Sequence, residues 1–125
     1  MLKFTKTDKA PEAIGPYSQG VVAGDLLFTS GQIALDPQSG EVCGKNIEEQ
    51  TERVMQNLGA ILEANNISFD KAIKTTCFLA NMSDFSAFNK VYAKYFTSKP
   101  ARSCVAVKEL PKNVLCEVEV IAYIG

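Results

Sequence analysis

Two short apolar stretches, separated by turn residues, occupy the first part of the chain. Leu2–Thr5 and Gly20–Ser30 have the apolar and β-branched character of strands. The pair Gly24-Asp25 divides the second stretch into two apolar runs, which predicts a hairpin. The N-terminal third is therefore expected to form a small β-meander.

Two later segments carry apolar residues at helical spacing. The first follows Asn46 and Glu49, which resemble a capping box, and is expected to continue until Asn65-Asn66 interrupts the pattern. The second is expected to begin at Ser83 as its cap and to end at Lys99-Pro100. Its apolar stripe consists of Phe85, Phe88, Tyr92, Tyr95 and Phe96.

Three further segments predict strands, because they are apolar or β-branched: 71–80, 103–108 and 115–124. The order of elements is then strands, helix, strand, helix and two strands. This order predicts an α+β fold with one mixed sheet and two helices packed on one face. A chain of 125 residues is large enough for one such core, so we expect residues 1–125 to form a single domain.

The last predicted strand has two apolar faces. Cys116, Val118 and Val120 lie on one side, and Ile121 and Tyr123 keep the other side partly apolar. Two helices can shield only one face of the sheet. The second face is therefore expected to meet another subunit, which predicts a homo-oligomer.

The charge and hydropathy of the chain limit the classes of partner that we expect it to bind. Net charge is −1 and the pI is near 5.4, which leaves no basic surplus for a phosphate backbone, so nucleic acid is not an expected partner. No apolar run approaches the roughly 20 residues that a membrane helix needs. The first ten residues contain three lysines and no apolar core of a signal peptide, so we expect neither secretion nor membrane insertion.

Cysteine and histidine content restricts the chemistry. The four cysteines form no C-x-x-C pair, which argues against a metal site and indicates reduced thiols in a cytoplasmic protein. The chain has no histidine, so the usual general base and the Ser-His-Asp mechanism are absent. Gly44-Lys45 lacks the spacing of a phosphate loop, and no cofactor is expected.

Three polar residues near the second helix and the strand after it are candidates for binding. Asn89 lies within the aromatic stripe, where its amide either meets a ligand or only orients the helix. Arg102 could form a two-pronged contact with a small carboxylate, or be an ordinary surface arginine. Cys104 shares a strand face with Arg102 and could equally be a buried structural thiol.

Further candidates lie in the last strand and the N-terminal third. Glu117 and Glu119 share one strand face, which is either solvated or, in a cleft between subunits, the place of a positioned base. Ser30 and Gly31 combine a small hydroxyl with backbone that a ligand can approach, although a plain turn has the same composition. Tyr17 lies in a glycine- and proline-rich loop that presents its ring.

These segments together resemble the reactive-intermediate deaminase family (Rid, formerly YjgF) along nearly the whole chain, from residue 10 to residue 122. The most diagnostic segment is P-A-R-S-C-V at 100–105. The other markers are A-I-G-P-Y-S-Q-G at 13–20, F-T-S-G-Q-I at 28–33, N-K-V-Y-A-K-Y-F at 89–96, L-P at 110–111 and C-E-V-E at 116–119.

The resemblance implies a chorismate-mutase-like fold and a homotrimer with three ligand sites in the clefts between subunits. Carried over position by position, it implies that Arg102 binds the substrate carboxylate and that Glu117 holds or activates water. The residues that it implies to line the cleft are Tyr17, Ser30, Gly31, Asn89 and Cys104.

The family implies hydrolysis of 2-imino acids and their enamine tautomers, such as 2-iminopropanoate and 2-iminobutanoate, to 2-keto acids and ammonia. These compounds are released by pyridoxal-phosphate enzymes that act on serine or threonine. One alternative is a regulatory trimer that binds 2-keto acids without catalysis. Another is RNA cleavage with inhibition of translation, against which the acidic pI and the missing histidine count.

Overall fold

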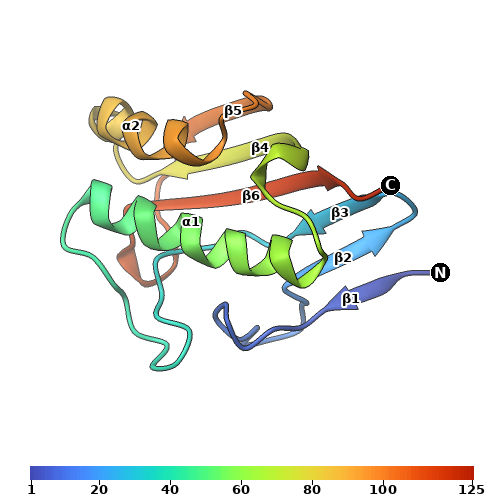
Figure 1. Cartoon of the computed structure of the whole chain (residues 1–125). Helices are drawn as coiled ribbons and strands as arrows, with labels where there is room; N and C mark the ends of the chain where they lie inside the picture. The colour runs from blue at the N-terminus through green and yellow to red at the C-terminus, as the bar shows by residue number, and fades with distance from the viewer.

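The computed structural model describes all residues from 1 to 125 and contains one six-stranded sheet and two α-helices (Figure 1). Neither helix is both long and apolar enough to cross a membrane. The predicted α+β fold is confirmed. The elements are β1 (Lys3–Thr5), β2 (Gly20–Ala23), β3 (Leu26–Thr29), α1 (Ile47–Ala64), β4 (Ala72–Leu79), α2 (Phe85–Tyr95), β5 (Ala101–Ala106) and β6 (Cys116–Tyr123).

The sheet is mixed, with the strand order β1-β2-β3-β6-β4-β5. Only β4 and β5 are parallel, because α2 crosses over between them and returns the chain to the same end of the sheet (Figure 1). Strand β5 begins two residues earlier than the sequence predicted, since its pairing with β4 begins at Ala101 opposite Lys74. The C-terminal strand β6 lies inside the sheet, and β5 lies at its edge.

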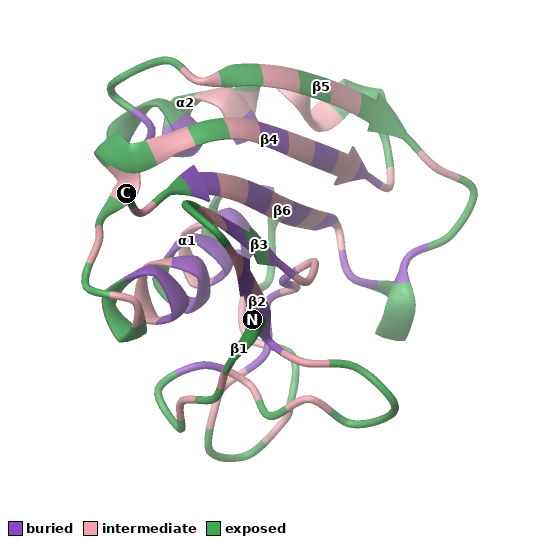
Figure 2. Ribbon diagram, turned by 90° about the vertical axis from the view of Figure 1, so that its right-hand side faces the viewer, coloured by how far each residue is buried: buried purple, intermediate pink, exposed green.

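Both helices cover the same face of the sheet, and the other face is open. On β6, Val118 and Val120 point to the helices and are 0% and 1% exposed. On the open face Phe28, Val105 and Tyr123 are 40%, 48% and 45% exposed. Figure 2 shows this alternation as buried and partly exposed bands along β4 and β6. The prediction of a second, partly apolar face is confirmed.

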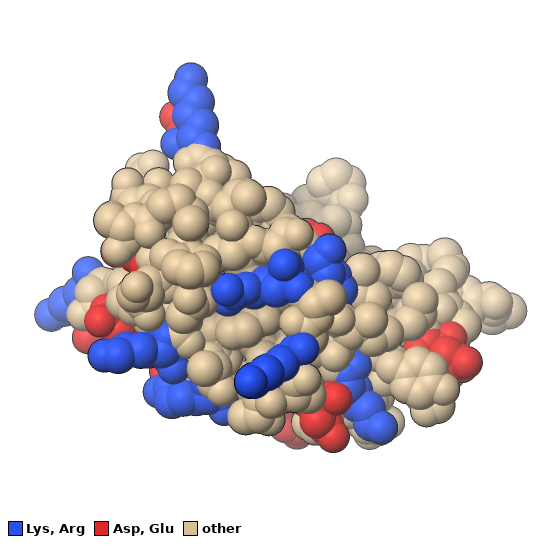
Figure 3. All heavy atoms as spheres, turned by 90° about the horizontal axis from the view of Figure 1, so that it is seen from above, with Lys and Arg blue, Asp and Glu red and all other residues tan.

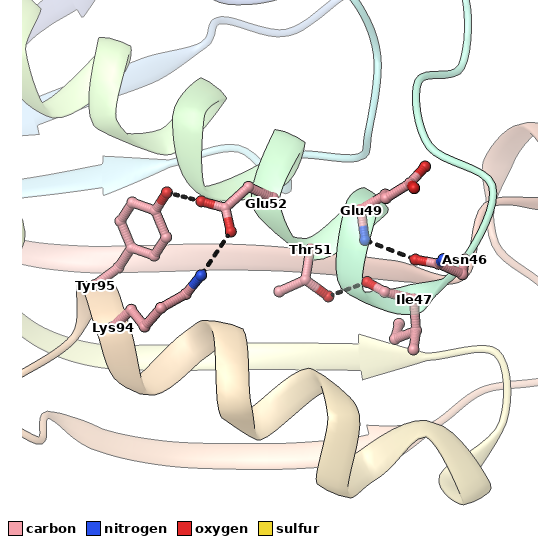
Figure 4. A network of polar contacts seen from close by, with 7 residues as sticks. All are labelled: Asn46, Ile47, Glu49, Thr51, Glu52, Lys94 and Tyr95. Carbon is pink, nitrogen blue, oxygen red and sulfur yellow. Dashed lines mark hydrogen bonds and ion pairs between the residues drawn. The ribbon is translucent and has the colours of Figure 1, made fainter.

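The cap of α1 is only partly the one that was predicted (Figure 4). Asn46 precedes the helix and its Oδ1 accepts a 2.9 Å hydrogen bond from the N–H of Glu49. The side chain of Glu49 accepts from the N–H of Lys45, one residue before the position that a capping box requires. The polar cap still fixes where α1 begins.

Both predicted ends of the second helix were wrong. Ser83 does not cap it, because this residue lies in a tighter 3₁₀ turn, Met82–Asp84, and α2 begins only after that turn. The helix ends at Tyr95, before the predicted stop at Lys99-Pro100. Phe96 leaves the helical conformation and is 2% exposed, so burial of its ring competes with continued helix.

Candidate functional site

The first group of candidate residues lies where α2 covers the edge strand β5. The guanidinium carbon of Arg102 is 4.8 Å from the ring centroid of Tyr92 and 5.4 Å from that of Phe85. Its Nη1 donates a 2.7 Å hydrogen bond to Oδ1 of Asn89. The one ion pair of the chain joins Lys94 to Glu52, so no carboxylate neutralises Arg102 and several of its N–H donors remain for a ligand.

Asn89 and Cys104 complete this set, and with Arg102 they form the arginine group. Asn89 faces β5 because positions 85, 89 and 92 align on one side of a helix. Cys104 is half-buried, and in the parallel pairing of β4 and β5 it lies opposite Cys77 of β4. Burial raises the pKa of the Cys104 thiol, and Arg102 opposes this rise. A neutral thiol is therefore expected beside the guanidinium at neutral pH.

The cysteines are free thiols. Cys77 and Cys116 are fully buried, and desolvation raises the pKa of Cys77 to about 12 and that of Cys116 to about 11. Cys116 also contacts Oγ1 of Thr51 at 3.6 Å. No three Cys, Asp or Glu side chains lie close enough together to hold a metal ion.

The surroundings of the arginine group are basic. Figure 3 views the molecule from the side of α2 and β5, where lysine and arginine side chains cover more of the surface than aspartate and glutamate do. Residues 71–108, which form β4, α2 and β5, contain one acidic residue, Asp84. A positive potential there favours a small anion as ligand. The basic residues of this segment are Lys71, Lys74, Lys90, Lys94, Lys99, Arg102 and Lys108.

Glu117 lies on the open face of the sheet, next to Gly31. The residue is half-buried, and a Cβ atom at position 31 would overlap its carboxylate and lie 2.9 Å from its Cδ. Only glycine therefore leaves the room that this carboxylate occupies. Burial, followed by the nearby charge of Glu119, raises the pKa of Glu117. A raised pKa suits a carboxyl group that exchanges protons near neutral pH.

Ser30 and Tyr17 lie beside Glu117 and Gly31, and these four residues form the glutamate group. The N–H of Ser30 donates to the carbonyl of Gln19 at 2.9 Å, and its hydroxyl donates to the carbonyl of Ser18 at 2.5 Å. Tyr17 is 53% exposed. A pocket of about 660 Å³ is formed here, and its lining includes Tyr17, Ser30, Gly31, Gln32, Lys112 and Glu117.

Gln19 lines the same pocket, and the sequence pattern did not reveal its structural role. It is 4% exposed, its Oε1 accepts from the N–H of Thr7 at 2.7 Å, and its Nε2 donates to the carbonyls of Thr7 and Pro11, each at 2.9 Å. The buried amide thus satisfies backbone groups of a loop that has no strand partner. A long amide side chain inside a glycine- and proline-rich loop was the available signal.

The arginine and glutamate groups do not meet within one chain. Arg102 pairs with Thr75 of β4, which is level with Val120 of β6, whereas Glu117 pairs with Phe78. Glu117 is therefore roughly 10 Å away along the strands and roughly 10 Å away across them. Arg102 points to the helix side and Glu117 to the open side. A joint site for one small molecule requires a second copy of the chain.

A comparison with protein families identifies the chain. The model of the family described as endoribonuclease L-PSP matches residues 7–124. The chain belongs to the endoribonuclease L-PSP family. This is the family of the Rid and RutC proteins, so the resemblance to Rid proteins is confirmed.

Named relatives of this family cover nearly the whole chain. The RutC family protein SSO3206 of Saccharolobus solfataricus is 54% identical and covers 98% of each chain. Reactive Intermediate Deaminase A, chloroplastic, of Arabidopsis thaliana is 45% identical over 96% of this chain and 65% of its own length. The solved structure of E. coli TdcF with bound serine is 42% identical, has a TM-score of 0.93 and covers 98% of this chain and 99% of its own.

Proposed function

We propose that this L-PSP family protein hydrolyses 2-imino acids and their enamine tautomers, such as 2-iminopropanoate and 2-iminobutanoate, to 2-keto acids and ammonia. The observation that carries the proposal is the guanidinium of Arg102, which is oriented by three side chains and not neutralised by any carboxylate. The relative named Reactive Intermediate Deaminase A supports the reaction class. The four free thiols favour work in a reducing compartment such as the cytoplasm.

The proposed active form is a homotrimer in which the arginine group of one copy faces the glutamate group of the next. The two groups occupy different parts of the surface, so a contact between them is head-to-tail and can close into a ring. The open sheet face, with Phe28, Val105 and Tyr123 between 40% and 48% exposed, offers apolar area for this contact.

Substrate binding depends on the carboxylate of the imino acid. Arg102 holds this carboxylate with two parallel N–H···O hydrogen bonds. Because Asn89 and the two rings already orient the guanidinium, little freedom is lost when the substrate binds. The imine carbon is thereby placed at a fixed distance from the carboxylate, and backbone groups near Gly31 and Cys104 contact the imine nitrogen.

Glu117 of the neighbouring copy transfers the protons of the reaction between water, the carbinolamine and the nitrogen. It takes a proton from a water molecule as the oxygen bonds to the imine carbon, and it returns this proton to the nitrogen. The resulting carbinolamine loses its hydroxyl proton through the same carboxylate, the C–N bond breaks, and ammonia leaves with that proton. The carboxylate is then restored and the product is a 2-keto acid.

The reaction needs only modest acceleration, because imines already decompose in water. Enzymes typically lower barriers by about 8 kcal/mol or more, and a reaction that is fast in water requires less. Positioning of the substrate and one general base therefore suffice. The scheme uses only side chains and backbone groups that the chain provides.

The proposal is tested by substituting one residue of each group. The imine is generated by a serine or threonine dehydratase, ammonia release is followed, and semicarbazide competes for the imine. We expect Arg102→Ala and Glu117→Gln each to lower turnover by roughly 100-fold or more while the trimer persists in light scattering. Glu63→Gln, an exposed carboxylate on α1, is the matched control. Undiminished turnover in either variant would reject the assigned role.

A second candidate function is a non-catalytic trimer that binds 2-keto acids or amino acids and regulates another protein. The solved structure of TdcF with bound serine favours this candidate, because it shows a ligand on a close structural relative. Saturable binding of 2-ketobutanoate without any acceleration of imine hydrolysis would select it. Acceleration that depends on both Arg102 and Glu117 would reject it.

A further inference from the structure

Arg102 is enclosed by one face of α2. Phe85, Asn89 and Tyr92 follow one another at intervals of four and three residues, so their side chains share a side of the helix. The ring centroids of Phe85 and Tyr92 lie 5.4 Å and 4.8 Å from the guanidinium carbon, and Asn89 accepts its hydrogen bond at 2.7 Å. The amide fixes one edge of the guanidinium, and the rings fix the tilt of its plane.

The ring of Tyr92 is itself held in place from β4. Its hydroxyl and Oγ1 of Thr75 lie 2.7 Å apart, and the two residues are 8% and 0% exposed. The ring also stacks on Phe96 with centroids 4.6 Å apart. A buried aromatic with a satisfied hydroxyl and a stacked neighbour has one available orientation.

These contacts form a closed circuit around Arg102. On the sheet, Arg102 is the direct partner of Thr75 in the parallel pairing of β4 and β5. Thr75 contacts the hydroxyl of Tyr92, and the ring of Tyr92 faces the guanidinium. The backbone of Arg102 and its guanidinium are thus both held in place by Thr75 of β4, the first directly and the second through Tyr92. Packing of the core alone requires an apolar ring at position 92, but it does not require a hydroxyl group that contacts Thr75.

We propose that Tyr92 is a positioning residue for Arg102, and that the Thr75–Tyr92 contact sets the direction in which the guanidinium meets the carboxylate of the ligand. The inference rests on the proposed function, since it assumes that Arg102 binds that carboxylate. Asn89 alone leaves the guanidinium free to rotate about the hydrogen bond, and the ring of Tyr92 removes this rotation. Phe85, which is less buried and farther away, assists from the opposite end of the helix face.

The test compares loss of the ring at position 92 with loss of a ring at position 88. Phe88 is 0% exposed and packs 5.7 Å from Tyr92, but it makes no cation–π contact with Arg102, so Phe88→Leu is a matched control for damage to the core. Binding of 2-ketobutanoate is measured by calorimetry, KM and kcat by imine hydrolysis, and Tm by thermal unfolding.

We expect Tyr92→Leu to raise Kd and KM by about tenfold, with kcat changed by less than about twofold. Phe88→Leu should lower Tm by about as much as Tyr92→Leu does, but it should leave Kd within about twofold of the wild type. Tyr92→Phe keeps the ring but loses the contact with Thr75, so it should raise Kd by about threefold, between the wild type and Tyr92→Leu. If Tyr92→Leu does not fold, Tyr92→Met, which also lacks the ring, replaces it; Phe85→Leu should raise Kd by about threefold.

Three outcomes overturn the inference: wild-type Kd in the variant that lacks the ring, wild-type Kd in Tyr92→Phe, which lacks the contact with Thr75, or an equal rise of Kd in Phe88→Leu. Arg102→Ala separates this failure from that of the proposed function. If Arg102→Ala abolishes binding and turnover but Tyr92→Leu and Phe85→Leu do not change Kd, only the positioning role is wrong. If Arg102→Ala binds and turns over normally, the proposed function is wrong as well.

Discussion

The two groups of candidate residues are built by different parts of the fold. The arginine group is held by regular elements, because α2 and β5 supply all of its members and the sheet fixes Arg102 opposite Thr75. The glutamate group combines one strand residue, Glu117, with loop residues, of which Ser30 is held by the backbone carbonyls of Gln19 and Ser18. The first group presents a guanidinium that no carboxylate neutralises, and the second presents a partly desolvated carboxyl group beside an open pocket.

This difference indicates a division of work. A rigid cationic group on a helix-covered edge suits recognition, which needs fixed geometry. A carboxyl group with a raised pKa in a pocket of about 660 Å³ suits proton transfer to and from water. Since neither group contains both functions, the activity should depend on assembly more strongly than on any single contact.

The largest expected effect comes from preventing assembly. Phe28→Asp places a charge on the open sheet face beside Ile121, where the wild-type ring is 40% exposed. We expect a folded monomer by light scattering and circular dichroism, and a loss of turnover of roughly 100-fold or more. Val42→Asp changes a residue that is 42% exposed but lies outside the sheet, and this variant should remain oligomeric. A fully active monomeric Phe28→Asp variant would contradict assembly through this face.

Gly31→Ala should damage the glutamate group without damaging the fold. The new methyl group would displace the carboxylate of Glu117, which is the flexible end of a side chain, so the free energy of unfolding should change by less than about 1 kcal/mol. A displacement of about 1 Å is expected to lower kcat about 100-fold. Kd for 2-ketobutanoate should change less, because Arg102 is untouched. Gly24→Asn, at a position with open space around it, is the control.

Glu119→Gln should shift the pH dependence of kcat/KM. Glu117 has to be ionised to accept a proton, so activity is lost as pH falls through its pKa, which lies above the ordinary value of about 4.3. The charge of Glu119 is the second cause of this rise, after burial. Its removal lowers the pKa of Glu117 and moves the acid limb to lower pH. Glu63→Gln should leave the limb in place, and an unchanged limb in Glu119→Gln would reject Glu117 as the titrating group.

The smallest expected effect concerns the polar contact between α1 and α2 (Figure 4). Glu52 of α1 accepts hydrogen bonds from the hydroxyl of Tyr95 and, at 3.1 Å, from Nζ of Lys94, and these partners, Tyr95 first, lower its pKa. A lowered pKa stabilises the fold above the pKa of the unfolded chain, and this stabilisation is lost as pH falls.

Glu52→Gln should therefore lower the free energy of unfolding by roughly 1 kcal/mol at pH 7, because the side chain of Glu52 is 35% exposed and solvent screens its charge. The difference in Tm from the wild type should shrink towards pH 3. Glu48→Gln, an exposed first-turn carboxylate without such partners, is the control. An equal loss of Tm at both pH values would show that the charge is not involved.

Much of the fold could be predicted from the sequence, because the period of the hydrophobic residues and the positions of the capping residues indicate the same elements. The alternation of β6 and the polar cap at Asn46 predicted a two-faced strand and the start of α1. The prediction that Ser83 caps the second helix was wrong, because a serine before an apolar stripe also fits a 3₁₀ turn. The candidate residues could be named from the family resemblance, but their spatial division could not. Placing Arg102 and Glu117 on opposite faces requires the register of both strands against β4, which no local pattern contains.

The most direct test of the account is complementation between two inactive variants. Arg102→Ala and Glu117→Gln chains are co-expressed with different tags, mixed trimers are purified, and imine hydrolysis is measured. If each active site takes Arg102 from one copy and Glu117 from the next, every mixed trimer contains one intact site among its three, so activity should be restored to about a third of the wild-type sites. Mixed trimers as inactive as their parents would contradict the account.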